Sequence, residues 1–328
     1  MGRFVAGECP ELDRLVADSL VAIGREVSEM RIPLLSGVVL GGGYGRGEGG
    51  AKGDFKAESP ESPVACRLSN DLDFFAITKD GTTDADAATV AKALEPVSRR
   101  WTEKLGVDVD FTGRTPWRIR HDQERLMVQE LIHGYVDVAG ATGEELFAGI
   151  PRREPSELPW IEAARLLMNR GMGLLLAKSK MESAKCEIDF INRNINKCIL
   201  GAGDARLIAN RRYRWRAPER AEALRDQMYR NAVAWKFRPA ESAVCDWNTA
   251  RDVWRAACEE VVENGACRGA LGRSLREAAR WVVRRRTLGA PASFGQNCTV
   301  RVLRGVKRCI EKRLPLPEAL RRDWEIFN

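Results

Sequence analysis

Histidine is scarce in this chain, with only His121 and His133 among 328 residues. A histidine-dependent catalytic triad and a histidine-rich zinc site are therefore both disfavoured. Cysteine is more common, but the nine cysteines are scattered and no two of them form a Cys-x-x-Cys pair. An odd number of cysteines without metal-ligand spacing favours reduced thiols, as in a cytosolic protein.

Long apolar runs are missing as well. No stretch approaches the roughly 18 apolar residues that a membrane helix needs, and the acidic N-terminus lacks the apolar core of a secretory signal. Hydrophobic residues make up 44% of the chain and charged residues 30%, which is typical of a soluble globular protein. We therefore expect a cytoplasmic protein that has no membrane partner.

Charge is unevenly distributed along the chain. Residues 1–150 hold 17 Lys and Arg against 25 Asp and Glu, a net charge of −8. Residues 151–328 hold 36 against 21, a net charge of +15. Since a change of this size favours a domain boundary, we expect two domains, 1–150 and 151–328. The basic half would face a polyphosphate, an anionic acceptor or both.

Two aspartates stand two residues apart in the segment Asn70-Asp71-Leu72-Asp73-Phe74. The apolar residues around them indicate a β-strand over 71–77, and side chains at i and i+2 of a strand point to the same face. Asp71 and Asp73 would therefore direct two negative charges at one small volume. Because such carboxylates repel each other unless a cation lies between them, the pair predicts a divalent metal site.

A third acid is expected beside this pair. The segment Val107-Asp108-Val109-Asp110-Phe111 alternates in the same way and predicts a second strand over 107–112. A neighbouring strand would bring Asp110, or alternatively Asp108, next to Asp71 and Asp73. Three carboxylates can hold two metal ions, which clamp the attacking and leaving oxygens of an in-line displacement.

The glycine run Gly41-Gly42-Gly43-Tyr44-Gly45-Arg46-Gly47 precedes the acidic strand. Glycines let a backbone approach a phosphate closely, so we expect the N–H groups of Gly42 and Gly43 to meet phosphate. Arg46 would fork onto a phosphate or be a solvated loop arginine. The run lacks the Gly-Lys-Ser/Thr of a P-loop, and no evident βαβ crossover follows it as in a dinucleotide-binding domain.

The first half of the chain mixes strand and helix patterns, whereas the second half is expected to be almost wholly helical. The predicted fold class is therefore α+β, with a helical bundle as the second domain. Expected strands are 37–40, 71–77, 107–112 and 135–139, and residues 51–67 are expected to be a loop. Expected helices are 10–30, 84–105, 124–132, 160–182, 186–200, 203–210, 217–233, 241–263, 268–287, 297–312 and 316–325.

Together these motifs resemble those of the DNA polymerase β-like nucleotidyltransferase superfamily. Val39-Leu40-Gly41-Gly42-Gly43 stands where that family has an apolar strand and a Gly-Gly step. Asp71-Leu72-Asp73-Phe74 stands where it has its metal-binding pair, and Val109-Asp110-Phe111 matches its third carboxylate.

The spacing and the length of the glycine run set this chain apart from the polymerases of that family. Gly43 and Asp71 are separated by 27 residues, more than the family's usual spacer, and an inserted loop at roughly 47–67 would explain the difference. The extended run Tyr44-Gly45-Arg46-Gly47-Glu48-Gly49 looks like that of bacterial nucleotidyltransferase-like proteins.

The resemblance implies a mixed-sheet nucleotidyltransferase core that transfers a nucleoside monophosphate, AMP in the first instance, from a nucleoside triphosphate to an acceptor hydroxyl with release of pyrophosphate. It implies two Mg²⁺ ions, with Mn²⁺ as the alternative, held by Asp71, Asp73 and Asp110. Asp110 would also help to activate the hydroxyl. Beside Gly42 and Gly43, nucleotide binding would fall to Tyr44 and Arg46.

The helical domain resembles the C-terminal bundle with which such small-substrate enzymes close over nucleotide and acceptor, which places the expected active site between the two domains. Lys178 would reach the triphosphate from its helix or be simply solvated. Lys197 stands between Ile195 and Ile199. Its partial burial would require an anionic partner, either Asp204 or a ligand phosphate.

The acceptor is open between several classes. A small-molecule hydroxyl suits a compact enzyme without a recognisable RNA module and is the first expectation. RNA, for example a tRNA end in a toxin-like modification, is supported by the basic half and by Arg211-Arg212-Tyr213-Arg214-Trp215-Arg216, which is otherwise a surface loop with its aromatics turned inward. A second nucleotide as acceptor would mean oligonucleotide or cyclic-nucleotide signal synthesis. The non-enzyme alternative is a nucleotide-binding protein on a decayed transferase fold, against which the intact acidic pair counts.

Overall fold

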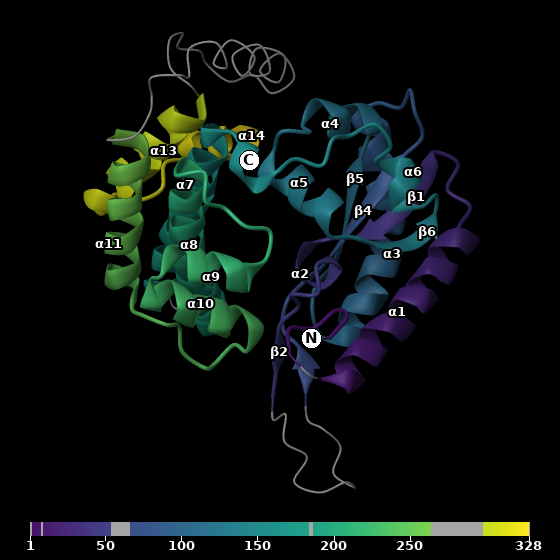
Figure 1. Cartoon of the computed structure of the whole chain (residues 1–328), viewed down its shortest axis with the longest axis horizontal. Coiled ribbons are helices and arrows are strands. Elements are labelled where there is room, and N and C mark those ends of the chain that lie inside the picture. The colour runs from purple at the N-terminus through teal and green to yellow at the C-terminus, as the bar shows by residue number, and fades with distance from the viewer. Residues whose placement is uncertain (1, 8, 54–65, 184–185, 264–297, 328) are drawn as a thin grey trace, which may run out of the picture. The chain divides into compact units, whose positions relative to one another are not determined.

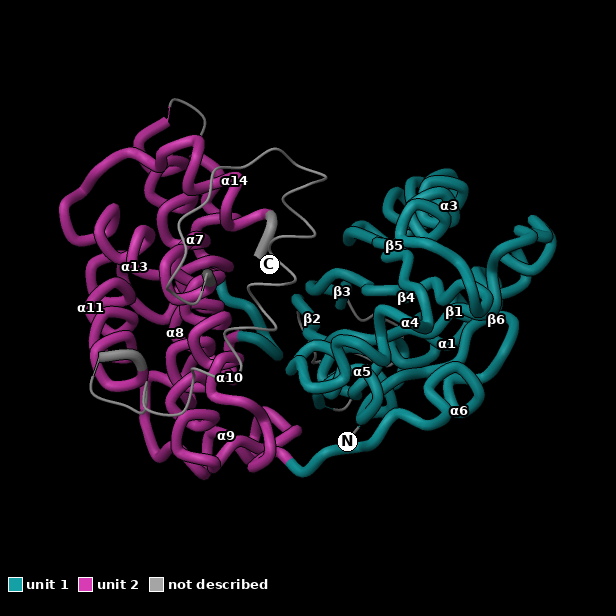
Figure 2. The backbone as a smooth tube through the Cα atoms, turned by 90° about the horizontal axis from the view of Figure 1, so that it is seen from above, with its two compact units in different colours: residues 1–154, 236–240 teal, residues 155–235, 241–328 magenta. Residues whose placement is uncertain are grey.

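The chain forms two compact units (Figure 2). The computed structural model describes residues 2–7, 9–53, 66–183, 186–263 and 298–327. The first unit comprises residues 1–154 and 236–240, and the second comprises residues 155–235 and 241–328. The boundary at 154/155 lies close to the expected 150/151. The assignment of residues 236–240 to the first unit was not expected from the sequence.

A four-stranded mixed sheet forms the centre of the first unit, in the order β5-β4-β1-β6. β1 pairs antiparallel with β4 and β6, whereas β4 pairs parallel with β5. The α+β class and a small mixed sheet are therefore confirmed. The four strands are β1 (Leu35–Leu40), β4 (Leu72–Thr78), β5 (Val109–Arg114) and β6 (Val136–Gly140).

Helix α3 (Asp84–Leu105) connects β4 to β5 and makes their parallel pairing possible, because parallel neighbours need a crossover connection. Its first turn is fixed by a capping box, in which the Thr83 side chain accepts from the N–H of Asp86 and the Asp86 carboxylate accepts from the N–H of Thr83. Gly106, with φ of 69°, ends the helix in the left-handed conformation that favours glycine. Local sequence therefore sets both ends of the crossover.

The two faces of the sheet carry different hydrophobic clusters. Leu72, Phe74 and Ala76 of β4 pack with α1 (Pro10–Glu29) and α3, which lie together along one face (Figure 1). Phe75 and Ile77 belong to a second cluster with residues of α4 (Pro116–His121) and α5 (Leu126–His133). By strand alternation, Asp71 and Asp73 share the face of Phe75 and Ile77.

A second, two-stranded sheet lies between the glycine run and β4. β2 (Ala51–Lys52) pairs antiparallel with β3 (Arg67–Leu68), so the expectation of a loop throughout 51–67 is wrong at its two ends. Residues 54–65, the interior of the expected insertion, lie outside the described residues. The shorter elements of this unit are α2 (Gly42–Gly45) and α6 (Gly143–Leu146).

The described part of the second unit is helical, as expected. α7 and α8 pack against each other, and two indole N–H groups of α11 donate to α7: Trp247 to the carbonyl of Leu174 and Trp254 to that of Leu167. These bonds satisfy the only polar atom of each buried indole. The helices are α7 (Trp160–Met181), α8 (Ile188–Ala209), α9 (Ala217–Leu224), α10 (Gln227–Phe237), α11 (Trp247–Cys258), α13 (Cys298–Glu311) and α14 (Glu318–Phe327).

Four expected helices of this unit have different limits. The expected helices 186–200 and 203–210 are one continuous helix, α8, because the glycines at its centre are tolerated where they pack closely against Arg170 and Tyr229. The expected helix 217–233 is broken at Arg225, whose φ of 58° is incompatible with a right-handed helix. The expected helix 241–263 begins only at Trp247 and ends in a π-helical segment, Glu259–Glu263. The expected helix 268–287 lies outside the described residues.

No helix among the described residues is long and apolar enough to cross a membrane.

Candidate functional site

The parallel pairing of β4 with β5 places Asp73 directly opposite Asp110. Side chains of directly paired residues lie on the same face of a sheet, so both carboxylates emerge on one side. Asp71 precedes β4 and shares that face with Asp73 because it stands two residues earlier. Both Asp73 and Asp110 are exposed. The fold therefore gathers the three predicted acids at one edge of two neighbouring strands.

The electrostatics of Asp110 reflect this gathering. Partial burial raises the pKa of its carboxyl, and the negative charges of Asp108 and Asp71 raise it further. Asp71 therefore lies close enough to Asp110 to disfavour its ionised form. Accumulated negative charge of this kind is relieved by a bound cation.

Oxygen ligands from carboxylates are the donors that Mg²⁺ and Mn²⁺ prefer, so the chemistry of the three acids fits either ion. The side chains as they stand are not in a coordinating arrangement. Across the described ranges, no group of three or more His, Cys, Asp or Glu side chains is placed to hold a metal ion.

The first glycines of the run lie against Asp73. The N–H of Gly41 donates to the carbonyl of Asp73 at 2.8 Å. Gly42 has φ of +61°, and a Cβ atom on it would lie 2.2 Å from Oδ2 of Asp73. Only glycine combines this conformation with this close approach. A ligand held by Asp73 would therefore lie beside the backbone of Gly42 and its neighbour Gly43.

Tyr44 has a different environment from the one expected of a nucleotide-binding side chain. The side chain is fully buried. Its hydroxyl donates to the carbonyl of Gly50 at 2.8 Å and accepts from the N–H groups of Ser69 at 3.3 Å and Asn70 at 3.5 Å. Burial raises the pKa of this hydroxyl to about 12. Tyr44 therefore fixes the chain just before Asp71, and its side chain does not face solvent.

Asn70 completes the same connection from the other side. Its Oδ1 accepts from the N–H of Gly50 at 2.5 Å, so both polar backbone groups of Gly50 are bound, one by Asn70 and one by Tyr44. A Cβ atom on Gly50 would lie 2.4 Å from the Asn70 oxygen. The end of the glycine run and the residue before Asp71 are thus held together, which explains why the run continues beyond its first three glycines.

Arg46 lies between two carboxylates. Its Nη1 is 3.5 Å from Oε2 of Glu130, and its Nε is 3.9 Å from Oε2 of Glu48. Glu48 is fully buried and also contacts Nζ of Lys236 at 2.7 Å. The structure thus gives Arg46 a place in an ion-pair network at the glycine run, and its side chain is only 13% exposed, so the alternative of a solvated loop arginine is wrong. Its contact with a phosphate stays a prediction.

The two lysines predicted to reach the triphosphate, Lys178 and Lys197, belong to the second unit. Nζ of Lys178 lies 3.2 Å from the Glu182 carboxylate and 5.5 Å from the ring centroid of Trp247. Lys197 is exposed, so its expected partial burial is wrong. Asp204, the partner considered for it, instead contacts Nε of Arg220 at 3.0 Å and accepts from the Tyr229 hydroxyl at 2.5 Å.

The arginine-rich segment 211–216 combines buried aromatic and exposed cationic side chains. Tyr213 is buried and meets Trp215 edge-on, with ring centroids 5.7 Å apart. The buried Arg220 donates to the carbonyls of Arg214 and Trp215 at 3.0 Å each and fixes this loop. Tyr213 is therefore packed inward and Trp215 is half-buried, while the arginines at 211, 212, 214 and 216 remain exposed.

Comparison with known proteins found no match to this chain among protein-family models, curated proteins or solved structures.

The contacts of Asn70 with Gly50 and of Lys236 with Glu48 were not predicted from the sequence. Asn70 directly precedes Asp71. Its amide can bind backbone groups and was therefore a usable signal of a structural contact at this position. Lys236 stands 188 residues after Glu48, and no local pattern indicates that they meet. Buried Glu48 itself carried a signal, since a glutamate within a glycine run that packs in a core requires a cation.

Proposed function

We propose that this protein is a metal-dependent nucleotidyltransferase with a DNA polymerase β-like core, and that it transfers a nucleoside monophosphate from a nucleoside triphosphate to an acceptor hydroxyl. The observation that carries the proposal is the register of β4 and β5, which pairs Asp73 with Asp110 while Asp71 lies on the same face. The approach of Gly42 to Asp73 supports it, because it brings a glycine backbone beside the proposed metal ligands.

Asp71, Asp73 and Asp110 would hold Mg²⁺, with Mn²⁺ as the alternative, and the chemistry that such an ion supplies when bound is neutralisation of charge on the triphosphate. The amides of Gly42 and Gly43 would bind and orient its β- and γ-phosphates. In the transfer, the acceptor oxygen bonds to the α-phosphorus, and the bond from that phosphorus to the bridging oxygen breaks. Pyrophosphate leaves with the electron pair.

Asp110 would accept the proton that the acceptor hydroxyl loses. Its position opposite Asp73 places it beside the proposed metal site, where a general base must lie to reach the hydroxyl of the acceptor. The proton would then pass to solvent and return the carboxylate to its starting state. The products are the nucleotidylated acceptor and pyrophosphate, so the atoms and charges balance.

The test is incubation of the full chain with Mg²⁺ and each α-³²P-labelled nucleoside triphosphate, alone and with metabolite or RNA extracts. We expect label on an acceptor with wild type and none with Asp73→Asn. Asp18→Asn, a change at another exposed aspartate on α1, serves as the matched control and should transfer label normally. Transfer by Asp73→Asn, or no transfer and no pyrophosphate from any nucleotide and extract, would contradict the proposal.

We take a small-molecule hydroxyl as the acceptor. The second candidate is RNA, which the exposed arginines of segment 211–216 favour. Salt separates the two: contacts with several phosphates weaken steeply as ionic strength rises, whereas a small uncharged acceptor shows little such effect. Between 50 and 200 mM NaCl, KM for the acceptor should therefore change less than about three-fold if it is small and about 10³-fold if it is gripped through six or more phosphates.

A further inference from the structure

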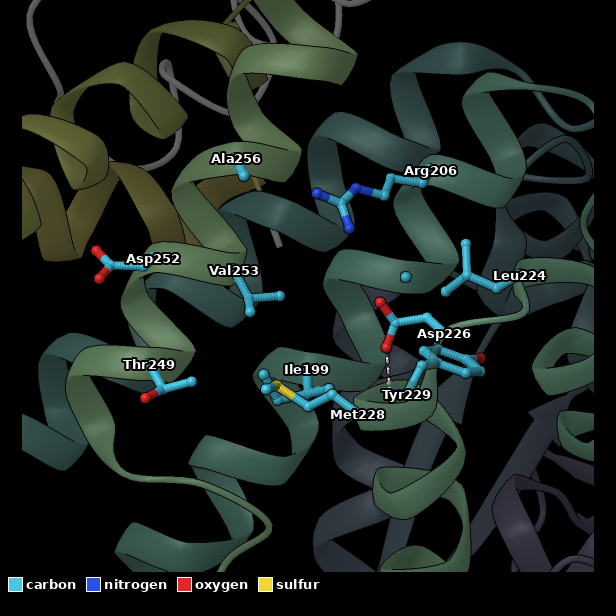
Figure 3. A pocket seen from close by; sticks show the side chains of 11 residues that line it. Ile199, Arg206, Leu224, Asp226, Met228, Tyr229, Thr249, Asp252, Val253 and Ala256 are labelled. Carbon is cyan, nitrogen blue, oxygen red and sulfur yellow. Dashed lines mark hydrogen bonds between the residues drawn. The ribbon is translucent and has the colours of Figure 1, made fainter.

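The second unit contains a hollow that has no part in the proposed reaction. Its volume is about 380 Å³, within the lower range of small-molecule pockets. It is bordered by α8, α11 and the start of α10 (Figure 3). A second hollow of about 270 Å³ shares Arg206, Leu224 and Asp226 with it, so the two adjoin.

The walls of the larger hollow are mainly apolar because of helical spacing. Thr249, Val253 and Ala256 lie on one face of α11, at intervals of four and three residues. Ile199 and Gly203 lie four residues apart on α8, and Leu224 and Met228 complete the wall. The ligand that fits these walls has an apolar body.

Two of the three charged residues that line this hollow already form ion pairs with other residues. Nε of Arg206 lies 2.9 Å from the Glu260 carboxylate. Asp252 pairs with Arg251 at 3.0 Å, and in Figure 3 its carboxylate points away from the hollow. Neither charge therefore selects a ligand of particular sign.

Asp226 is the charged residue that remains. Its Oδ1 accepts from the N–H of Tyr229 at 2.8 Å and caps the first turn of α10. Its other oxygen points away from Tyr229 into the space bordered by Arg206 and Val253 (Figure 3). Within the described residues, Asp226 forms no ion pair, and its Oδ2 accepts no hydrogen bond. The hollow therefore offers one uncompensated carboxylate oxygen above an apolar wall.

We propose that this hollow binds a small organic cation, an ammonium group carried on an alkyl or aryl body, with the ammonium at Oδ2 of Asp226 and the body against Leu224, Met228 and Val253. The negative charge disfavours phosphates and carboxylic acids at the same place. This proposal does not depend on the proposed nucleotidyl transfer, since every residue named belongs to the second unit.

The test compares two probes of similar size and opposite charge, 2-phenylethylammonium and 3-phenylpropionate, on the full chain. Methyl NMR of [¹³C-methyl]methionine protein reports on the hollow through Met228, whose signal is assigned with Met228→Leu. We expect a saturable shift with the cation and a dissociation constant about ten-fold lower than that of the acid, since one partner attracts and the other repels Asp226.

Three variants make the assignment specific. Asp226→Asn keeps a good helix cap and removes the charge, so it should weaken the cation about three- to five-fold and abolish the preference over the acid. Asp252→Asn removes a charge of the same kind that faces away, and should leave binding unchanged. Val253→Trp fills the hollow and should remove the saturable shift with either probe.

A hollow that is merely a solvated surface depression would give a different pattern. Shifts that do not saturate, equal affinity for the two probes, or equal effects of Asp226→Asn and Asp252→Asn would each overturn the proposal.

Discussion

Oε2 of the fully buried Glu48 lies 2.7 Å from Nζ of Lys236, which follows it by 188 residues. The N–H of Glu48 also donates to the carbonyl of Gly43 at 2.8 Å. This ion pair therefore anchors the glycine run at the point where the backbone of Gly43 faces the proposed phosphate site. It also accounts for the assignment of residues 236–240 to the first unit.

Removing Lys236 should destabilise the first unit markedly. Lys236→Met removes the lysine that contacts the buried Glu48 at 2.7 Å, and breaking a buried pair from one side typically costs about 3 kcal/mol. The measurement is hydrogen exchange of the β1 and β4 amides, which reports the opening free energy of this sheet.

The exposed pair of Arg99 and Glu95 provides the matched control for that change. Their side chains are 78% and 54% exposed, so Arg99→Met should cost no more than about 0.5 kcal/mol. In the double variant Glu48→Gln/Lys236→Met, part of the lost stability should return because the buried side chain at position 48 no longer carries a negative charge. Equal costs for Lys236→Met and Arg99→Met would refute a structural role for the buried pair.

Asp110 pairs with Asp73, whereas Asp108 precedes the first residue of β5. Substitutions of these two residues should therefore have different effects on activity. Asp110→Asn removes the proposed proton acceptor and should lower kcat/KM about 10²- to 10⁴-fold. Asp108→Asn removes only a neighbouring charge and should change it less than about ten-fold. Both residues are exposed, so the thermal midpoint should stay close to that of wild type in each variant. A larger effect at Asp108 would make it the third acid instead.

Gly42 and Gly81 form a controlled comparison of glycine substitutions. Both have positive φ, +61° and +81°, so alanine introduces a backbone strain of about 1–2 kcal/mol at either position. Only at Gly42 does the added methyl meet a side chain, the Asp73 carboxylate, whereas nothing lies within 4 Å at Gly81. Gly42→Ala should therefore lose nucleotidyl transfer and weaken Mn²⁺ binding, while Gly81→Ala keeps both. Similar activity in the two variants would show that Gly42 is not part of the proposed site.

Tyr44 should make the stability of the first unit sensitive to alkaline pH. The pKa of its hydroxyl in the folded protein, about 12, lies above the ordinary value of 10.0. The protonated hydroxyl therefore contributes fully to the free energy of unfolding below pH 10, and this contribution is lost as pH rises toward 12. Over that interval, wild type should lose roughly 2–3 kcal/mol more opening free energy than Tyr44→Phe does. The comparison is hydrogen exchange in β1 and β4, extrapolated across the pH series.

At neutral pH the same variant should still be less stable, since three backbone groups lose their hydroxyl partner, at a cost of about 1–3 kcal/mol. Tyr135→Phe is the control, because Tyr135 is only half-buried and packs edge-on against Phe147. A pH dependence identical in wild type and Tyr44→Phe would show that the hydroxyl titrates normally.

The acidic strands were predictable because one physical rule, alternation, controls them. Asp71, Asp73 and Asp110 each stand beside apolar residues that must be buried, so the burial of Leu72 and Val109 forces the acids to the other face. The pairing of Leu72 with Val109 then sets Asp73 opposite Asp110. Sequence therefore suggested which acids lie together, while the parallel direction came from the crossover helix.

The role of Tyr44 and the limits of several helices depend on tertiary contacts, which the local sequence does not encode. The role of Tyr44 follows from its burial against Gly50 and Asn70, and a tyrosine within a glycine run gives no sign of which way it points. The break at Arg225 was missed because arginine is ordinarily a good helix former, and only the observed φ of 58° reveals the turn. Tertiary packing similarly kept α8 intact through Gly201 and Gly203.

The short pairing of β2 with β3 closes off the segment inserted before Asp71. The length of that segment therefore need not affect the positions of the acids. Residues 51 and 52 pair with 68 and 67, so the two ends of the segment between them are held at neighbouring points. Lengthening a segment closed in this way costs only about 0.6 kcal/mol for each doubling. This position therefore suits the insertion of an affinity tag or a reporter domain, because Asp73 can stay in register with Asp110 when residues are added there.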